Sequence, residues 1–368
     1  MKNCLLVIFM LTASCMRGPD VRVEGFGQLS DGQQTHLFTI SNSSGASMSL
    51  CDYGARIVSI RVPDRNGLMG DVIVGPVDIG TFENADRFMG CTIGRYANRI
   101  EGPTVTIDGV DYQLETNETL DGVPVQCHSG VNGIDRFVWD GKAVSDSCVR
   151  FTRTSPDGEG GFPGNCNICV SFTLTGDNVC IVEYEATTDK PTFVNLSNHS
   201  YFNMRGSSCY VMGQVLEVEA DSCIRNNSRY CPDSVVSVEG TPFDFRTPHR
   251  VDYRIDMPDP HLALMHGMSA CWIIRDWDGT LKKAAVLYDP VSGRGVEVRT
   301  TEPCLLTYTG RGFNGSMMGK TGPIDKFAGM LLETIHAADS PHQERFPGTL
   351  LRPGESFTST TQFRFFAQ

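Results

Sequence analysis

Clusters of Lys and Arg are missing from this 368-residue chain, and its formal net charge is −12. Because a nucleic-acid surface needs clustered basic side chains to meet the phosphates, this balance argues against nucleic acid as a partner. A neutral small molecule is compatible with such a charge. The composition, with 40% hydrophobic and 20% charged residues, is that of an ordinary folded protein.

Beyond its first residues the chain also lacks an apolar segment long enough to cross a bilayer. At the start, Lys2 precedes a short apolar stretch, Cys4 to Leu11, which ends in small residues before Cys15. This pattern is typical of an export signal. We expect residues 1–15 to be a signal peptide, with Cys15 a candidate for lipidation. The expected location is the periplasm, either free or membrane-anchored as a lipoprotein, or otherwise the exterior as a secreted protein. Ordinary signal cleavage, and a cytoplasmic protein with a chance apolar start, are the alternatives.

A long apolar face with the 3.6-residue period of a helix is likewise missing. Short alternating segments rich in Val, Ile, Thr and Phe recur from residue 21 to the end, separated by turn signals such as Asp31-Gly32 and Asn66-Gly67. No linker, repeat or low-complexity tract divides them. The pattern predicts one all-β domain over residues 21–368, built as a large antiparallel β-sandwich.

Spacing typical of a metal site is not found. Cys166 and Cys169 form a lone C-x-x-C without a second pair, which a zinc site would need. His336 and His342 are six residues apart, which suits no common helical ligand pair. We expect no metal and no cofactor. Most of the 14 cysteines are interpreted as small core residues, with one or two disulfides left open.

Five polar segments could carry chemistry, and each also has a purely structural interpretation. Histidines beside strands are often only hydrogen-bonded, an Asn-Arg pair can be a turn with a surface cation, and a carboxylate can be an ion-pair partner. For Asp244 that interpretation is a local turn and a salt bridge to Arg246. The segments are 94–100 (GRYANRI), 127–130 (CHSG), 194–203 (VNLSNHSYFN), 241–246 (TPFDFR) and 330–334 (MLLET).

Together, and in this order, these segments resemble the aldose 1-epimerase (galactose mutarotase) family over residues 25–366. Residues 184–203 are the most specific match, and residues 94–100 and 127–130 resemble the family's GRYANRI and LHGG motifs. Residues 241–246 resemble its TPFDLR motif. Glu333-Thr334, the Phe346-Pro347 pair and residues 351–355 (LRPGE) resemble its closing block.

The resemblance implies an open sugar cleft on a large antiparallel β-sandwich. It implies Glu333 as general base and His199 as general acid. The residues implied to bind sugar hydroxyls and stabilise charge are Asn98, Arg99, His128 and Asp244.

Three departures from the family pattern remove polar groups. Leu306 stands where the family often has a sugar-binding Gln, and Ile335 stands where a Gln usually follows Glu-Thr. The family's Gly-Tyr-Asp-His-Asn segment is here residues 267–271 (GMSAC). The acid–base pair is retained, so these changes affect the expected preference for galactose and not the expected reaction.

The resulting hypothesis is an isomerase that interconverts the α and β anomers of a free aldose such as glucose or galactose. A base removes the proton of the anomeric hydroxyl while an acid protonates the ring oxygen, which requires an ionised Glu333 and a protonated His199. A non-catalytic carbohydrate-binding or sensing protein on the same fold is the alternative. A further alternative is an epimerase for hexose 6-phosphates. It would need a pair of cations to bind the phosphate and is usually cytoplasmic, so the apparent export signal argues against it.

Overall fold

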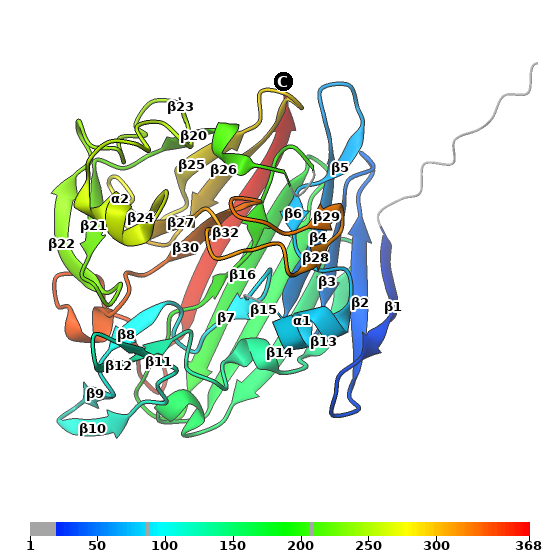
Figure 1. The fold of residues 1–368 in the computed structure, drawn as a ribbon. Helices are drawn as coiled ribbons and strands as arrows, with labels where there is room; N and C mark the ends of the chain where they lie inside the picture. The colour runs from blue at the N-terminus through cyan, green and yellow to red at the C-terminus, as the bar shows by residue number, and fades with distance from the viewer. Residues whose placement is uncertain (1–19, 86–87, 207–208) are drawn as a thin grey trace, which may run out of the picture.

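Antiparallel strands dominate the computed structural model, which describes residues 20–85, 88–206 and 209–368 (Figure 1). The expected signal segment and Cys15 lie outside the described residues. The α-helices found in these ranges are two short ones, α1 (Ile79–Ala85) and α2 (Pro260–Met265). This confirms the predicted all-β class. Within the described ranges, no helix has the length and apolar character needed to cross a membrane.

The largest sheet has nine strands and forms one layer of the molecule (Figure 1). Its strand β16 shows how one face is buried, because Val182, Tyr184 and Ala186 are buried while Glu183 and Glu185 are exposed. In spatial order the strands are β13 (Asp140–Ser145), β14 (Cys148–Ser155), β15 (Cys166–Leu174), β16 (Val179–Thr188), β32 (Phe357–Ala367), β26 (Arg294–Thr300), β25 (Lys282–Tyr288), β20 (Val215–Val218) and β23 (His249–Arg250).

A seven-stranded sheet packs over the buried face of the first, and Trp272, Leu305 and Leu332 share one apolar core with Phe172 and Phe363. In spatial order its strands are β22 (Pro232–Ser237), β21 (Ser222–Asn226), β24 (Ser269–Ile273), β27 (Cys304–Tyr308), β30 (Met330–Ile335), β19 (Tyr201–Phe202) and β6 (Ile73–Val74). All six residues of β30 are buried, so this strand is covered on both faces.

The N-terminal strands form a five-stranded sheet that adds Ile40, Met48 and Ile60 to the same core. These strands are β1 (Asp20–Gln28), β2 (Gln34–Ser41), β3 (Ser47–Cys51), β4 (Arg56–Pro63) and β5 (Met69–Asp71). A three-stranded sheet has the order β11 (Glu118–Leu120), β12 (Val123–Cys127) and β8 (Arg99–Glu101). The two-stranded sheets pair β9 (Thr104–Ile107) with β10 (Val110–Gln113), β17 (Thr192–Phe193) with β31 (Leu350–Leu351), β18 (Ser197–Asn198) with β7 (Thr92–Ile93), and β28 (Met318–Gly319) with β29 (Gly322–Pro323).

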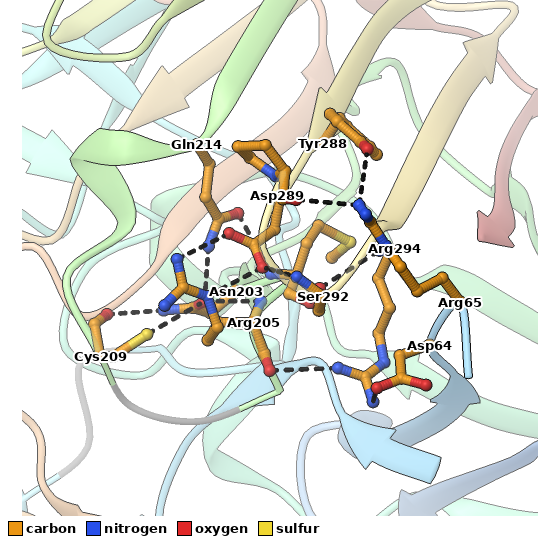
Figure 2. A network of polar contacts seen from close by, with 12 residues as sticks. Asp64, Arg65, Asn203, Arg205, Cys209, Gln214, Tyr288, Asp289, Ser292 and Arg294 are labelled. Atoms are coloured by element: carbon orange, nitrogen blue, oxygen red, sulfur yellow. Dashed lines mark hydrogen bonds and ion pairs between the residues drawn. The ribbon is translucent and has the colours of Figure 1, made fainter. Parts of the chain in front are cut away.

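A polar network surrounds the buried Asp289 and joins neighbouring sheets (Figure 2). We call it the Arg205–Asp289 network; it comprises Asn203, Arg205, Gln214, Asp289, Ser292 and Arg294, and none of these lines the cavity described below. The Arg205 guanidinium donates two hydrogen bonds to the Asp289 carboxylate, at 2.8 and 2.9 Å. Arg294 donates to the carbonyl oxygens of Val62 (3.1 Å) and Leu68 (2.6 Å), so the β25–β26 hairpin is tied to the five-stranded sheet.

Twelve cysteines lie in the described residues and all are free thiols, nine of them buried. The disulfides that the sequence left open are therefore not formed among them, and the interpretation as small core residues fits their burial.

Candidate active site

A cavity of about 260 Å³ opens on the face of the seven-stranded sheet that points away from the main core. It receives side chains from this sheet and from loops next to β7, β8 and β12. Its polar and aromatic lining includes Phe88, Asn98, Arg99, Glu118, His128, His199, Tyr201, Tyr230, Ser269, Tyr308, Arg311 and Glu333.

The strand register explains which residues reach the floor of the cavity. Residues directly opposite one another in antiparallel strands place their side chains on the same face. In β24, β27 and β30 this produces two adjacent rows on the cavity side, Cys271–Leu306–Glu333 and Ser269–Tyr308–Leu331. The residues between them, such as Leu305 and Leu332, point to the main core instead.

Glu333 is fully buried at the floor, and neither carboxylate oxygen has a hydrogen-bond partner among the described residues. Burial raises the pKa of Glu333 to about 8, and the nearby Ser197 opposes this only weakly. The Ser197 hydroxyl donates to the carbonyl oxygen of Thr334 at 2.8 Å and is thus committed elsewhere. The cross-strand neighbour Leu306 adds apolar surface where a polar partner could have stood.

His199 lies between β18 and β19, and its backbone fixes its position. Its N–H donates to the carbonyl oxygen of Cys91 and its carbonyl oxygen accepts from Gly90 N–H, both at 2.9 Å. The ring is edge-on to those of His128 and Tyr201, at centroid distances of 5.3 and 5.4 Å. Burial lowers the pKa of His199 to about 3, and its Nδ1 atom is buried without a partner among the described residues.

Asn98 and His128 hold each other through reciprocal hydrogen bonds. Asn98 N–H donates to Nδ1 of His128 at 3.1 Å, and the carbonyl oxygen of Asn98 accepts from His128 N–H at 3.0 Å. Since Nδ1 is an acceptor, the neutral ring carries its proton on Nε2. Burial lowers the pKa of His128 well below its ordinary value, so the ring is a neutral donor at the cavity wall.

Arg99 is paired by Glu118 and is not an uncompensated cation. Its Nε and one terminal nitrogen donate to the two carboxylate oxygens at 2.8 and 3.0 Å. The guanidinium carbon lies 5.2 Å from the centre of the Tyr230 ring. Glu118, Tyr230 and the nearby Arg311 were not singled out by the sequence, although Arg311 lies only five residues after Leu306, a position where the sequence departs from the family pattern.

Asp244 is the one predicted site residue that the structure does not bring to the cavity. It is not among the lining residues, and its carboxylate accepts two hydrogen bonds from Arg246, at 2.8 and 3.0 Å. It also accepts from Gly240 N–H at 3.2 Å. The expectation that Asp244 lines the cleft is therefore corrected: the carboxylate closes a local turn and salt bridge, because Arg246 is only two residues away.

Among the described residues, no group of three or more His, Cys, Asp and Glu side chains is arranged to hold a metal ion. His336 contacts Glu302 at 2.6 Å, and His342 contacts Asp339 at 2.7 Å. The two histidines that suggested a metal are thus each paired with a carboxylate.

Comparison with known proteins gives concordant matches over most of the chain. Residues 36–364 match the sequence model of the family described as Aldose 1-epimerase. Human galactose mutarotase is 36% identical over 345 residues, with 92% of this chain and 97% of the relative covered. The aldose 1-epimerase of Escherichia coli K12 is 33% identical over 341 residues, with the same coverage.

Solved structures show the same fold. An aldose epimerase homologue from C. elegans superimposes with a TM-score of 0.82 at 26% identity, covering 90% of this chain and 99% of its own. A galactose 1-epimerase from Lactobacillus acidophilus has a TM-score of 0.81 at 24% identity, covering 95% and 99%.

Proposed function

This chain belongs to the aldose 1-epimerase family, and on this premise we propose that it is an isomerase that interconverts the α and β anomers of a free aldose. One observation carries the proposal. Two buried titratable groups, Glu333 and His199, line the same sugar-sized cavity, and buried atoms of both lack hydrogen-bond partners among the described residues. Buried polar groups are normally satisfied within the protein, so such atoms are suited to partners that a ligand brings.

The reaction needs one proton acceptor and one proton donor. The acceptor takes the proton of the anomeric hydroxyl, the bond from C1 to the ring oxygen breaks, and the donor protonates that oxygen. Rotation about C1–C2 in the open aldehyde exposes the other face, and the reverse transfers close the ring. No net oxidation occurs, so the residues present can complete the cycle.

The charge states of the pair differ from the sequence expectation. An ionised Glu333 and a protonated His199 were expected, whereas burial favours the neutral form of both: a protonated carboxyl and an uncharged imidazole at neutral pH. Both arrangements hold one proton on the pair, so a single proton transfer interconverts them. Each group therefore serves as donor in one half of the cycle and as acceptor in the other.

The other predicted residues can act on the sugar oxygens. The Nε2–H of His128 is preorganised by the hydrogen bonds between His128 and the main chain of Asn98. The side-chain amide of Asn98 is held by Arg99 N–H, which donates to its Oδ1 atom at 2.8 Å, and the Arg99 side chain is held by Glu118. Donors fixed in a water-poor site stabilise charge that develops on an oxygen in the transition state. We assign Asn98, Arg99 and His128 to substrate binding and charge stabilisation.

Polarimetry of freshly dissolved α-D-glucose and α-D-galactose tests the proposed reaction. We expect the protein to accelerate the approach to the equilibrium rotation, and Glu333→Gln to lower kcat by about 10²–10⁴-fold, the usual contribution of general acid–base assistance. The variant also controls for contaminating mutarotase. Binding without acceleration over a panel of aldoses would favour the non-catalytic carbohydrate-binding alternative.

Export is a separate proposal that rests on the first 15 residues of the sequence alone. We propose a signal peptide with Cys15 as the lipidation candidate, which would anchor the protein to a membrane. Protein isolated from its host should lack Met1 and Lys2. Palmitate labelling that disappears in Cys15→Ala would support the anchor, and an unlabelled processed protein would support simple secretion.

A further inference from the structure

Arg311 is a cation of the cavity wall that the mechanism above does not use. It lies in the loop between β27 and β28, is partly buried, and lines the same cavity as Glu333. Its Nε atom is buried without a hydrogen-bond partner, and among the described residues Arg311 takes part in no ion pair. Its guanidinium carbon lies 5.9 Å from the centre of the Tyr230 ring.

Arg311 has neither of the arrangements that satisfy other buried or partly buried arginines among the described residues. Arg95 is fully buried and donates to the carbonyl oxygens of Ser155, Pro163 and Gly164. Three other partly buried arginines each hold a carboxylate: Arg153 with Glu159, Arg205 with Asp289, and Arg225 with Asp259. A partly buried guanidinium that has neither a carboxylate nor backbone acceptors is poorly compensated, so an acceptor that a ligand supplies would stabilise it.

The acidic groups of the cavity do not supply that partner. The Glu118 carboxylate already accepts both hydrogen bonds of the Arg99 fork. Glu333 is buried at the floor, and burial raises its pKa to about 8, so it carries little charge at neutral pH. The cavity therefore holds one balanced pair, Arg99–Glu118, and one unbalanced positive charge at Arg311.

The strand register places this charge away from the reacting end. Leu306 lies opposite Glu333, and Tyr308, two residues further along β27, lies opposite Ser269 and Leu331. Two strand residues rise about 6.6 Å, close to the width of a pyranose ring with its substituents. The loop carrying Arg311 continues beyond that end, and the Tyr308 hydroxyl fixes it by accepting from Gly312 N–H at 2.8 Å.

We propose that Arg311 is a subsite for an anionic group, and that the preferred substrate is an aldose with a carboxylate remote from its anomeric carbon, an aldohexuronic acid. This rests on the proposed mutarotation, since it assigns the substrate class of the same cavity. The anomeric centre faces Glu333 and His199 while the carboxylate meets the Arg311 fork. A planar guanidinium matches a carboxylate in a two-point hydrogen bond, and one unpaired cation balances one negative charge. A phosphate dianion would leave its second charge uncompensated.

Anomer exchange measured by NMR at equilibrium tests this on D-galacturonate and D-galactose, which differ only at C6. We expect kcat/KM of the wild-type protein to be about 10–100-fold higher for galacturonate, the usual effect of a charge-assisted hydrogen bond. Arg311→Gln should lower the galacturonate value by about that factor and change the galactose value by less than about threefold. Arg311→Lys should retain part of the preference, because it keeps the charge and loses the fork.

A matched control is Arg254→Gln, because Arg254 also lies over a tyrosine ring, Tyr253 at 4.8 Å, but does not line the cavity. It should leave both substrates unchanged. Melting curves separate loss of folding from loss of binding, and the galactose rate of each variant reports an intact active site. Any of three results would overturn the carboxylate subsite. These are equal wild-type rates on the two sugars, an equal loss of rate on both sugars in Arg311→Gln, and a preference for galactose 6-phosphate. No exchange on any aldose would overturn the proposed reaction itself.

Discussion

The carboxylates of Asp289 and Glu333 are both fully buried, yet their surroundings differ completely. Asp289 accepts two hydrogen bonds from Arg205 and one from Ser292 N–H at 2.8 Å (Figure 2). Burial alone would raise its pKa, but these bonds outweigh burial and lower the pKa of Asp289. Glu333 has no such partners among the described residues, and burial raises its pKa to about 8.

The difference separates a structural polar cluster from a site for a ligand. A satisfied buried network holds elements together, and in the Arg205–Asp289 network it joins the hairpin β25–β26 to the segment after β19. Unsatisfied buried groups cost stability and persist where a ligand provides the missing partners. Substitutions in the two regions should consequently differ in kind: those in the network should lower stability, whereas those in the cavity should lower the rate without lowering stability.

The largest expected effect is on kcat of the proposed reaction in the cavity. His199→Asn removes one of the two proposed proton-transfer groups, so kcat should fall by about 10²–10⁴-fold. The melting temperature should change little, because Nδ1 of His199 has no partner to lose among the described residues. Polarimetry beside a melting curve measures both quantities. If the variant loses stability but keeps its rate per folded molecule, the role of His199 is structural and not catalytic.

The next effect is on the pH dependence of stability. The folded pKa of Glu333, about 8, lies above its ordinary value of 4.5, so the native state binds the proton more tightly. The associated stability is fully present below pH 4.5 and is lost as pH rises through about 8. Glu333→Gln mimics the protonated form and should be more stable than wild type by on the order of 2–4 kcal/mol at pH 8.5, with little difference at pH 4.5. Urea unfolding at both pH values tests this, and an equal difference at both would refute the buried, proton-binding carboxyl.

The same proton sets a limit on activity. Above pH 8 the pair Glu333–His199 loses its single proton, because Glu333 ionises while His199 is already neutral. We expect kcat/KM to fall as pH rises through about 8. A rate that keeps rising to pH 10 would show that the pair does not need this proton.

Asp289→Asn tests the Arg205–Asp289 network, the structural region of the comparison. It weakens charge-assisted hydrogen bonds to Arg205 inside the network, which should lower the free energy of unfolding by about 1–3 kcal/mol. The rate per folded molecule should remain that of wild type, since Asp289 does not line the cavity. Denaturant titration and polarimetry on the same sample provide the measurements. A drop in kcat without a drop in stability would mean that the two regions are coupled.

The smallest expected effect concerns Asp244. Its ion pair with Arg246 is partly exposed, and such pairs contribute less than about 1 kcal/mol. Asp244→Asn should leave kcat and KM within about twofold of wild type, whereas His128→Asn should raise KM by about tenfold through loss of a hydrogen bond. A large KM increase in Asp244→Asn would restore the residue to substrate binding.

Sequence alone was sufficient for the fold class, and five of the six residues that it proposed for the sugar site line the cavity. Alternating polarity marks strands with one exposed face, such as β16 over Val179–Thr188. It did not mark β24, β27 and β30, the strands of the cavity floor, because most of their residues are buried on both faces and the alternation disappears. Glu333 was found through its family motif and not through periodicity.

Only the tertiary structure decided which polar residues meet and in what charge state. Asp244 and Glu333 are both carboxylates in motif-like segments, but Arg246 captures the first while the fold leaves the second unpartnered under apolar cover. Arg311 acquires significance only because Glu118 is already held by Arg99, two residues that are nineteen positions apart and meet across β8, β11 and β12. Desolvation depends on all neighbours in space, and a linear pattern specifies only the neighbours along the chain.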